Sequence, residues 1–304
     1  MLVALATCSK DVDAAGRLLD FCHELGGCHS HSLVIVADGG TQWSSVVALM
    51  ELGKRSFDNV SISATDHSTD GWPQGANELW LESAKFAYQR RCQWLFLEPD
   101  CVPLKKGWLD AIAAEAVQYR EHYIGHVYDC SQPGLPAKLL SGIATYPANA
   151  IELIGPLIRN NPARAFDVLM AESVLPKAKH TALIQHRWGE AGLPPTFVES
   201  KTPDSPRNAL ELGTITQQAV LFHRCKDESL QNLLRVKLGL VRPDRNFVVV
   251  LNVCNSDAEL MIKNLMWMSE LGGCPNHQAL LAYDTSINPK LLSRIQAAAG
   301  PLFK

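Results

Sequence analysis

A short apolar run at residues 94–97 limits the folds open to this chain. Trp94-Leu95-Phe96-Leu97 is continuously apolar, with no alternation between apolar and polar positions. A strand covered on both faces has this pattern, whereas a strand with one solvated face alternates. The run therefore predicts a central strand of a parallel sheet, and with it an α/β fold.

The chain before this run alternates between predicted strands and helices. Strands are expected at 2–6, 33–37 and 60–64, and helices at 11–25, 44–52 and 77–91. This succession predicts a parallel sheet with right-handed crossovers. Further strands are expected at 123–128, 141–147, 181–186 and 218–222, helices at 111–119, 150–159 and 165–171, and a mobile, proline-rich loop at 190–206.

Two carboxylates follow the apolar run. Glu98 and Asp100 are separated by Pro99, whose fixed φ and missing N–H end the strand and keep the next residues extended. Residues i and i+2 of an extended segment point the same way, so the two carboxylates share one side. Paired carboxylates at the carboxyl end of a central strand are suited to bind Mg²⁺ or Mn²⁺.

Other polar residues follow the neighbouring predicted strands. Thr7, Asp38 and Asp66 come after the first, second and third strands, so we expect them along the same edge of the sheet as Glu98 and Asp100. Asp is also common in turns and caps, and for Asp38 alone a structural role is as readily expected. The coincidence of these residues with the acidic pair favours a ligand site.

Composition narrows the class of protein. With 304 residues, 47% hydrophobic and 19% charged, the chain is expected to form one large or two smaller globular domains. A net charge of −3 makes nucleic acid a less expected partner, although the basic pairs Arg90-Arg91 and Arg235/Lys237 leave room for it.

Nine cysteines without a Cys-x-x-Cys pair predict reduced thiols in a cytoplasmic protein. No apolar run is long enough to cross a bilayer, and residues 1–8 are better interpreted as a strand than as a signal.

The last segment repeats the first at an offset of 246 residues. Leu271-Gly272-Gly273-Cys274 matches Leu25-Gly26-Gly27-Cys28, and Asp284 matches Asp38. The same offset also pairs Cys254 with Cys8, Asp257 with Asp11 and Glu270 with Glu24. We therefore expect two domains, 1–240 and 246–304, the second a partial copy of the first. The copy contains no counterpart of Glu98 or Asp100, so we expect no metal site of the same kind in it.

With these residues in place, the chain resembles the GT-A fold glycosyltransferases, which use nucleotide sugars and carry a metal-binding Asp-x-Asp (DXD) motif. The resemblance covers about the first three quarters of the chain. It depends on Glu98-Pro99-Asp100 as a variant of that motif, on the acidic residues after the second and third strands, and on the late pair His223 and Lys226. The first motif position is Glu where the family has Asp.

The resemblance implies a fold, an activity and roles for individual residues. It implies a mainly parallel GT-A sheet and a metal-dependent transfer of sugar from a nucleoside-diphosphate sugar to an acceptor hydroxyl. Asp38 and Asp66 would contact the ribose and base of the nucleotide, with Thr7 beside them. Glu98, Asp100 and His223 would hold Mn²⁺ or Mg²⁺. Lys226 would contact the diphosphate. Gly75, Asn77 and Lys85 lie where the family places contacts to the donor sugar.

Two acidic residues are candidates for the catalytic base. An inverting transferase needs a carboxylate to take the proton of the acceptor hydroxyl, and Asp167 and Glu172 lie between the metal motif and the last strand. A solvated helix face explains each of them equally well, and a retaining enzyme needs no such base. His186, at a predicted strand end before Trp188, could reach the metal, but a hydrogen-bonded structural histidine is the favoured interpretation.

Two other functions stay open. A nucleotidyltransferase shares the sheet and the metal, but Thr7-Cys8-Ser9-Lys10 lacks the glycines of a triphosphate-binding loop. A catalytically silent binding or assembly module on the same fold fits the partial repeat and the Glu of the motif. The sequence identifies neither the donor sugar and base nor the acceptor, which could be a glycan, a protein, a metabolite or a modified DNA base.

Overall fold

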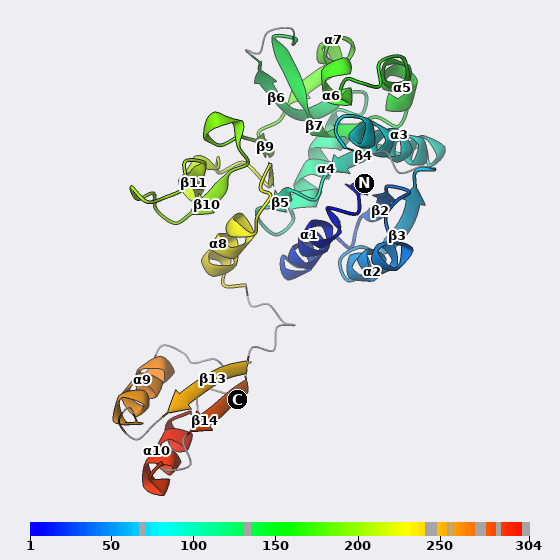
Figure 1. Ribbon diagram of the computed structural model, residues 1–304. Helices are drawn as coiled ribbons and strands as arrows, with labels where there is room; N and C mark the ends of the chain where they lie inside the picture. Colours follow the sequence, from blue (N-terminus) through cyan, green and yellow to red (C-terminus); the bar gives the residue numbers. More distant parts are fainter. Residues whose placement is uncertain are drawn as a thin grey trace. The chain divides into compact units, whose positions relative to one another are not determined.

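A computed structural model of the protein describes residues 1–66, 71–130, 135–240, 248–253, 256, 258–270, 278–283 and 287–299. The chain divides into two compact units, Met1–Val241 and Arg242–Lys304. Each unit has its own sheet and helices (Figure 1).

The first half of the first unit follows the strand and helix alternation expected from the sequence. Its elements are β1 (Leu2–Thr7), α1 (Val12–Glu24), β2 (Ser32–Ala37), α2 (Trp43–Lys54), β3 (Asn59–Ala64), α3 (Gln74–Gln89), β4 (Trp94–Leu97), β5 (Cys101–Pro103) and α4 (Trp108–Gln118).

The second half has shorter elements. They are β6 (Tyr123–Asp129), β7 (Lys138–Tyr146), α5 (Ala150–Asn160), α6 (Phe166–Leu169), α7 (Ala171–Val174), β8 (Ala178–His180), β9 (Ile184–His186), β10 (Thr196–Val198), β11 (Ala209–Glu211), β12 (Leu221–His223) and α8 (Ser229–Leu238). The expected loop at 190–206 contains β10 and a 3₁₀ turn at Glu190–Gly192, so it is not structureless.

A seven-stranded sheet forms the centre of the first unit, in the order β3-β2-β1-β4-β7-β6-β8. The pairs β1–β2, β2–β3, β1–β4 and β6–β8 are parallel, whereas β7 is antiparallel to both of its neighbours. The expected mixed α/β fold with a mainly parallel sheet is thereby confirmed. The chain runs from β1 outward to β3 and then returns to the other side of β1 with β4, so the strand order reverses between β1 and β4. Open α/β sheets bind ligands at the carboxyl ends of the strands beside such a reversal.

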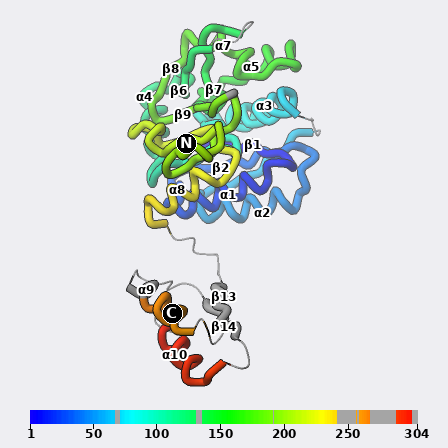
Figure 2. Tube along the Cα trace, turned by 60° about the vertical axis from the view of Figure 1, so that its left-hand side comes forward, coloured from blue at the N-terminus to red at the C-terminus, as the bar shows by residue number. Residues whose placement is uncertain are grey.

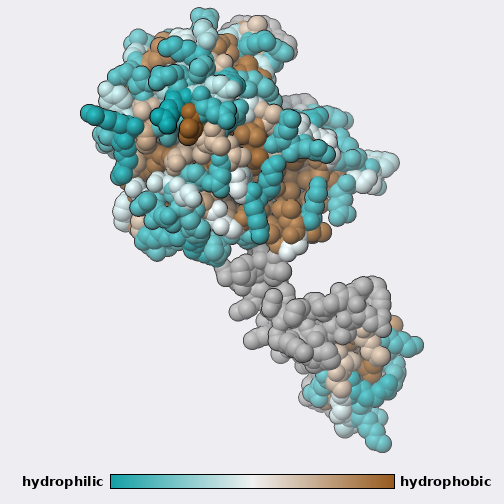
Figure 3. Space-filling view, turned by 180° about the vertical axis from the view of Figure 1, so that it is seen from behind, coloured by the Kyte–Doolittle hydropathy of each residue, from teal (hydrophilic) through white to brown (hydrophobic). Residues whose placement is uncertain are grey.

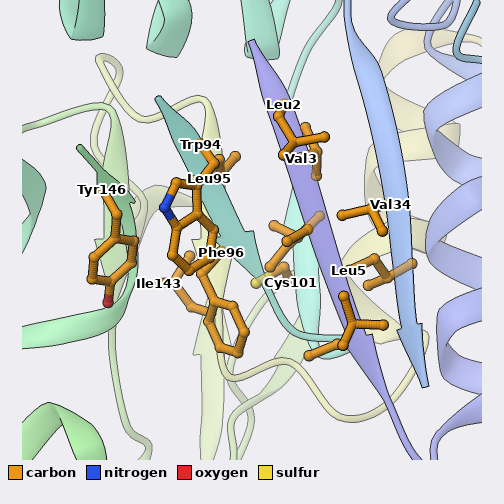
Figure 4. Packing of buried hydrophobic residues seen from close by; sticks show 14 of the residues in the cluster. Leu2, Val3, Leu5, Val34, Trp94, Leu95, Phe96, Cys101, Ile143 and Tyr146 are labelled. Atoms are coloured by element: carbon orange, nitrogen blue, oxygen red, sulfur yellow. The ribbon is translucent and has the colours of Figure 1, made fainter. Parts of the chain in front are cut away.

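Helices cover both faces of this sheet and bury β4, as its apolar sequence predicts. Figures 1 and 2 show α1 and α2 on one face of β1–β3 and α3 on the other. Trp94 and Leu95 are fully buried, and the ring of Trp94 stacks on Tyr146 of β7 with centroids 4.8 Å apart (Figure 4). Trp80 of α3 is also fully buried, whereas Trp43 at the start of α2 is 63% exposed.

A second, three-stranded sheet is built from segments far apart in the sequence. Its order is β5-β12-β9, with β12 antiparallel to β5 and parallel to β9. The neighbouring helix α8 is held to α1 by a buried ion pair, in which Arg235 Nε and Nη2 donate to the two oxygens of Glu24 at 2.6 and 3.0 Å. Two parallel hydrogen bonds of this kind fix the relative position of both partners.

The second unit is a β-α-β-α arrangement whose order and spacing match those of β1 to α2. It consists of β13 (Val248–Val253), α9 (Ala258–Glu270), β14 (Gln278–Tyr283) and α10 (Pro289–Ala299), each beginning 246 residues after its counterpart. β13 and β14 pair in parallel with Val248 opposite Gln278, which is the register of Leu2 opposite Ser32 shifted by 246. Cys254, Asp257 and Asp284 lie outside the described residues, so the partial repeat stays a prediction.

On the face of the first unit seen in Figure 3, polar side chains surround patches of apolar ones. Among the described residues, no helix has both the length and the apolar character required to cross a bilayer.

Candidate active site

A cavity of about 570 Å³ opens at the carboxyl ends of β1, β2 and β4, beside the reversal of strand order. This volume suits a small organic ligand. Residues from α1, α3, α6 and β12 complete its wall. The polar side chains that line it are Thr7, Cys8, Lys10, Asp11, Asp13, Arg17, Asp38, Trp72, Glu98, Asp100, Asp167, His186, His223, Arg224 and Lys226.

The expected metal ligands meet in this cavity. Nε2 of His223 lies 3.1 Å from Oε2 of Glu98 and 3.2 Å from Oδ1 of Asp100. The histidine is buried, and both carboxylates line the cavity. Residues 125 positions apart in the sequence therefore form one cluster of two carboxylates and an imidazole.

Backbone pairing explains why the cluster forms. β5 begins at Cys101, directly after Asp100, and pairs with β12 so that Cys101 lies opposite His223. The backbone N–H of Cys225 donates to the carbonyl oxygen of Asp100 at 3.0 Å and continues this pairing by one more bond. The buried Cys101 thiol consequently lies within 4.8 Å of the Asp100 and His223 ligand atoms.

Opposite charges at the cluster shift the pKa values of both partners. Burial raises the pKa of Asp100, but His223, Arg224 and Lys226 outweigh it and lower the pKa to about 2. Burial lowers the pKa of His223, but Asp100 and Glu98 outweigh it and raise the pKa to about 9. Asp100 is therefore a carboxylate at neutral pH.

Positive charge lies next to the cluster. Arg224 and Lys226 follow β12 and line the cavity, and Arg224 has a φ of 95°, in the left-handed region that non-glycine residues rarely adopt. Its guanidinium lies over the ring of Trp188, 4.1 Å from the centroid, a cation–π arrangement that orients the side chain. Two cations beside a pair of carboxylates favour an anionic ligand that also needs a cation.

His186 lies beside the same cluster and is hydrogen-bonded there, which is compatible with the favoured interpretation of a hydrogen-bonded histidine. Its Nδ1 lies 2.9 Å from Nδ1 of His223 and 3.2 Å from Oγ of Ser141. Burial, then the charges of His223 and Arg224, lower the pKa of His186 to about 2, so it is neutral at physiological pH.

Asp167 is the one predicted base that lines the cavity. It lies in the first turn of the short helix α6 (Phe166–Leu169), is half-buried, and accepts a hydrogen bond from the N–H of Val168 at 2.9 Å. Burial, reinforced by the nearby charge of Glu98, raises its pKa. A raised carboxylate pKa suits a group that accepts a proton near neutral pH.

The donor set fits a hard or intermediate divalent cation. Carboxylate and imidazole ligands are typical of Mg²⁺, Mn²⁺ and related ions. Oδ1 of Asp100 is buried, and its partner among the described residues is Nε2 of His223, with which it forms an ion pair at 3.2 Å. A buried carboxylate oxygen in this position is available to a cation.

Asp38 and Thr7 line the cavity at the ends of β2 and β1, as expected. Asp38 also has a structural role, since its Oδ1 accepts from the N–H of Gly40 at 2.7 Å. Asp66 and Glu172 are exposed and are not among the lining residues, so the structure does not bring them to the cavity, and their roles stay predictions.

Of the three residues expected to contact the donor sugar, one lines the cavity and two do not. Gly75 lines the cavity. Asn77 is buried and holds the segment before α6, donating to the carbonyl of Arg164 and accepting from the N–H of Phe166. Lys85 pairs with Glu82 at 3.2 Å on the exposed side of α3. Lys10, Arg17 and Arg224 also line the cavity, although the sequence analysis gave them no role. Of these three, only Arg224 had a signal in the sequence, its position directly after His223.

No protein-family model matches the sequence, and a search of curated proteins finds no match. Solved structures do share similarity with the chain. One is the bifunctional glycosyltransferase WbbM in its apo form, with a TM-score of 0.48 and 10% identity over 75% of this chain and 46% of that one. The chain thus spans about half the length of that structure.

Two further similar structures are complexes. The galactosyltransferase LgtC with donor and acceptor sugar analogues has a TM-score of 0.45 and 8% identity over 79% of this chain and 96% of that one. Residues 1–349 of S. aureus TarS with UDP have a TM-score of 0.38 and 14% identity over 59% and 57%. At these levels the likeness concerns the fold alone and assigns no activity to this chain.

The raised pKa of Asp167 predicts a pH-dependent effect on stability. The folded state binds the proton of Asp167 more tightly than the unfolded state does, so stability falls as pH rises from the unfolded pKa through the folded pKa. Above that window, Asp167→Asn removes the unfavourable buried charge. We expect it to raise the unfolding midpoint by about 1–4 °C at pH 8.

Thermal unfolding of both proteins from pH 4 to pH 8 tests this, and the difference should shrink toward pH 4. Glu172→Gln, on the exposed face of the next helix α7, is the matched control and should change the midpoint at neither pH. A destabilising effect of Asp167→Asn at pH 8 would show that the carboxylate is favourably bound in the folded state.

Proposed function

We propose that the chain is a metal-dependent glycosyltransferase that moves a sugar from a nucleoside-diphosphate sugar to an acceptor hydroxyl. The observation that carries this proposal is the approach of His223 to Glu98 and Asp100 within 3.2 Å, in a cavity at the reversal of strand order. A nucleotide sugar is the donor class because the same cavity presents carboxylates for a cation and cationic side chains for a diphosphate. Solved structures similar to the chain include complexes with UDP and with donor and acceptor sugar analogues.

Departure of the diphosphate leaves negative charge on its oxygens. Mn²⁺ or Mg²⁺ held by Glu98, Asp100 and His223 would offset that charge. Lys226 and Arg224 would add positive charge from the chain itself, beside the oxygens on which the leaving diphosphate develops negative charge. Asp38 and Thr7, at the neighbouring strand ends, would bind the nucleoside part.

Asp167 is the better candidate for the base of an inverting transfer. It lines the cavity and its pKa is raised, whereas Glu172 is exposed on α7. In this role the Asp167 carboxylate takes the proton of the acceptor hydroxyl as the hydroxyl oxygen bonds to the sugar carbon. A retaining mechanism would dispense with this step, and the experiment below distinguishes the two.

Two features of the remaining chain belong to the same proposal. All seven cysteines within the described residues are free thiols, which supports a reducing, cytoplasmic setting. The matching order and register of β13 to α10 support a partial second copy of the first nucleotide-fold segment at 246–304.

The proposal predicts nucleotide binding that depends on a metal. Titration calorimetry with uridine, guanosine, cytidine and adenosine diphosphates should show binding of one of them that strengthens when Mn²⁺ is added. Asp100→Ala should lose at least about 10-fold of the metal-dependent affinity, because it removes the buried carboxylate of the cluster. Asp204→Ala, in an exposed loop, is the control and should bind like the unaltered protein.

If none of the four nucleotides binds more tightly with Mn²⁺, or if Asp100→Ala binds unchanged, the enzyme proposal fails. Metal-dependent binding of a nucleoside triphosphate in preference to every diphosphate would favour the nucleotidyltransferase. Binding without turnover of any nucleotide sugar would favour the silent module.

The proposed base predicts a kinetic difference between two carboxylates. Release of nucleotide from the matching nucleotide sugar should fall by about 10²–10⁴ in Asp167→Asn, while metal-dependent binding of the diphosphate is kept. Glu172→Gln should change neither quantity. Equal rates for Asp167→Asn and the unaltered protein would exclude Asp167 as the base and favour a retaining mechanism.

A further inference from the structure

His186 and His223 face each other across two paired strands. β9 and β12 are parallel neighbours, and their register places His186 opposite His223. The two Nδ1 atoms are 2.9 Å apart, which is hydrogen-bonding distance. Exactly one proton can lie between two nitrogens at this distance, so one Nδ1 donates and the other accepts.

The state of Nε2, the other ring nitrogen of His223, decides which of the two Nδ1 atoms donates. Nε2 of His223 lies beside Glu98 and Asp100, and it must present a lone pair if it is to bind a cation held by those carboxylates. A neutral imidazole with its lone pair on Nε2 carries its proton on Nδ1. His223 Nδ1–H is then the donor, and His186 Nδ1 is the acceptor.

His186 is held in place by residues of the large sheet. Its ring is parallel to that of Tyr128 on β6, with an angle of 3° and centroids 5.2 Å apart. Oγ of Ser141 on β7 also lies 3.2 Å from this Nδ1. Stacking on Tyr128 and the contact with Ser141 fix the ring of His186, so it can hold the ring of His223 in a single orientation.

We infer that His186 is a positioning residue, which accepts the Nδ1–H bond of His223 and thereby directs the Nε2 lone pair of His223 between Glu98 and Asp100. This inference rests on the proposed function, since it concerns the metal ligands of that site. His186 is not itself a ligand, because its Nδ1 faces His223 rather than the carboxylates.

Two substitutions of similar size separate this role from simple packing. His186→Leu removes the acceptor, whereas His186→Asn can place an amide oxygen near the position of Nδ1. Mn²⁺ affinity is measured by electron paramagnetic resonance of the free ion, in the presence of the diphosphate that binds best. We expect His186→Leu to weaken Mn²⁺ binding by about 10–100-fold, the usual effect of losing a partner behind a metal ligand, and His186→Asn to stay within about threefold.

If His186 acted through packing alone at this half-buried position, His186→Asn would bind Mn²⁺ no more tightly than His186→Leu. Unchanged affinity in His186→Leu, or an equal loss in both variants, would overturn the inference. Failure of the unaltered protein to bind Mn²⁺ would instead overturn the proposed function. If the unaltered protein binds Mn²⁺ and Asp100→Ala does not, the site is established and only the role of His186 is under test.

A measurement on the unaltered protein avoids any variant that fails to fold. Long-range ¹H–¹⁵N correlation of the histidine rings, with Mg²⁺ and the diphosphate bound, reports which nitrogen carries each proton. We expect His223 to be protonated at Nδ1 alone and His186 at Nε2 alone. Protonation of His186 at Nδ1 would contradict the inference.

Discussion

The contact between His223 and the carboxylates of Glu98 and Asp100 is the interaction on which the site depends. It joins the end of the central strand β4 to a strand more than a hundred residues later, and it requires β12 to pair with β5. The buried His223 is thereby held beside two carboxylates of opposite charge, whose side chains are 12% (Asp100) and 30% (Glu98) exposed. Removing Asp100 would leave the buried His223 with less opposite charge beside it, which is less favourable than the complete cluster.

The surroundings of this contact keep its charges in the state that the chemistry needs. Burial alone would favour the neutral form of Asp100, yet His223, Arg224 and Lys226 lower its pKa to about 2. Asp167 has a raised pKa, because its burial and the nearby charge of Glu98 outweigh the opposing charge of Arg224. One cavity thus contains a carboxylate that stays ionised and another that takes up a proton more readily, a division typical of sites that combine ion binding with proton transfer.

The sequence predicted those parts that depend on local pattern. The uninterrupted apolar run at 94–97 identified the central strand, and the polar residues after successive strands identified the edge where Thr7, Asp38 and Asp100 gather. The strands predicted at 181–186 and 218–222 contain or overlap β9 and β12, but the three-residue β5 is too short to have a recognisable period, so the small sheet in which β12 pairs with both β5 and β9 was not foreseen. Asp66 lies on the exposed side of its strand end, and a strand-end position alone could not distinguish it from Asp38.

Crystals grown with Mn²⁺ and the best-binding nucleoside diphosphate test the central claim most directly, through anomalous diffraction measured at the manganese absorption edge. The account predicts a single strong peak within about 2.5 Å of an Asp100 carboxylate oxygen and of Nε2 of His223. A peak elsewhere in the molecule, or nucleotide density in the cavity with no manganese beside those two side chains, would contradict it.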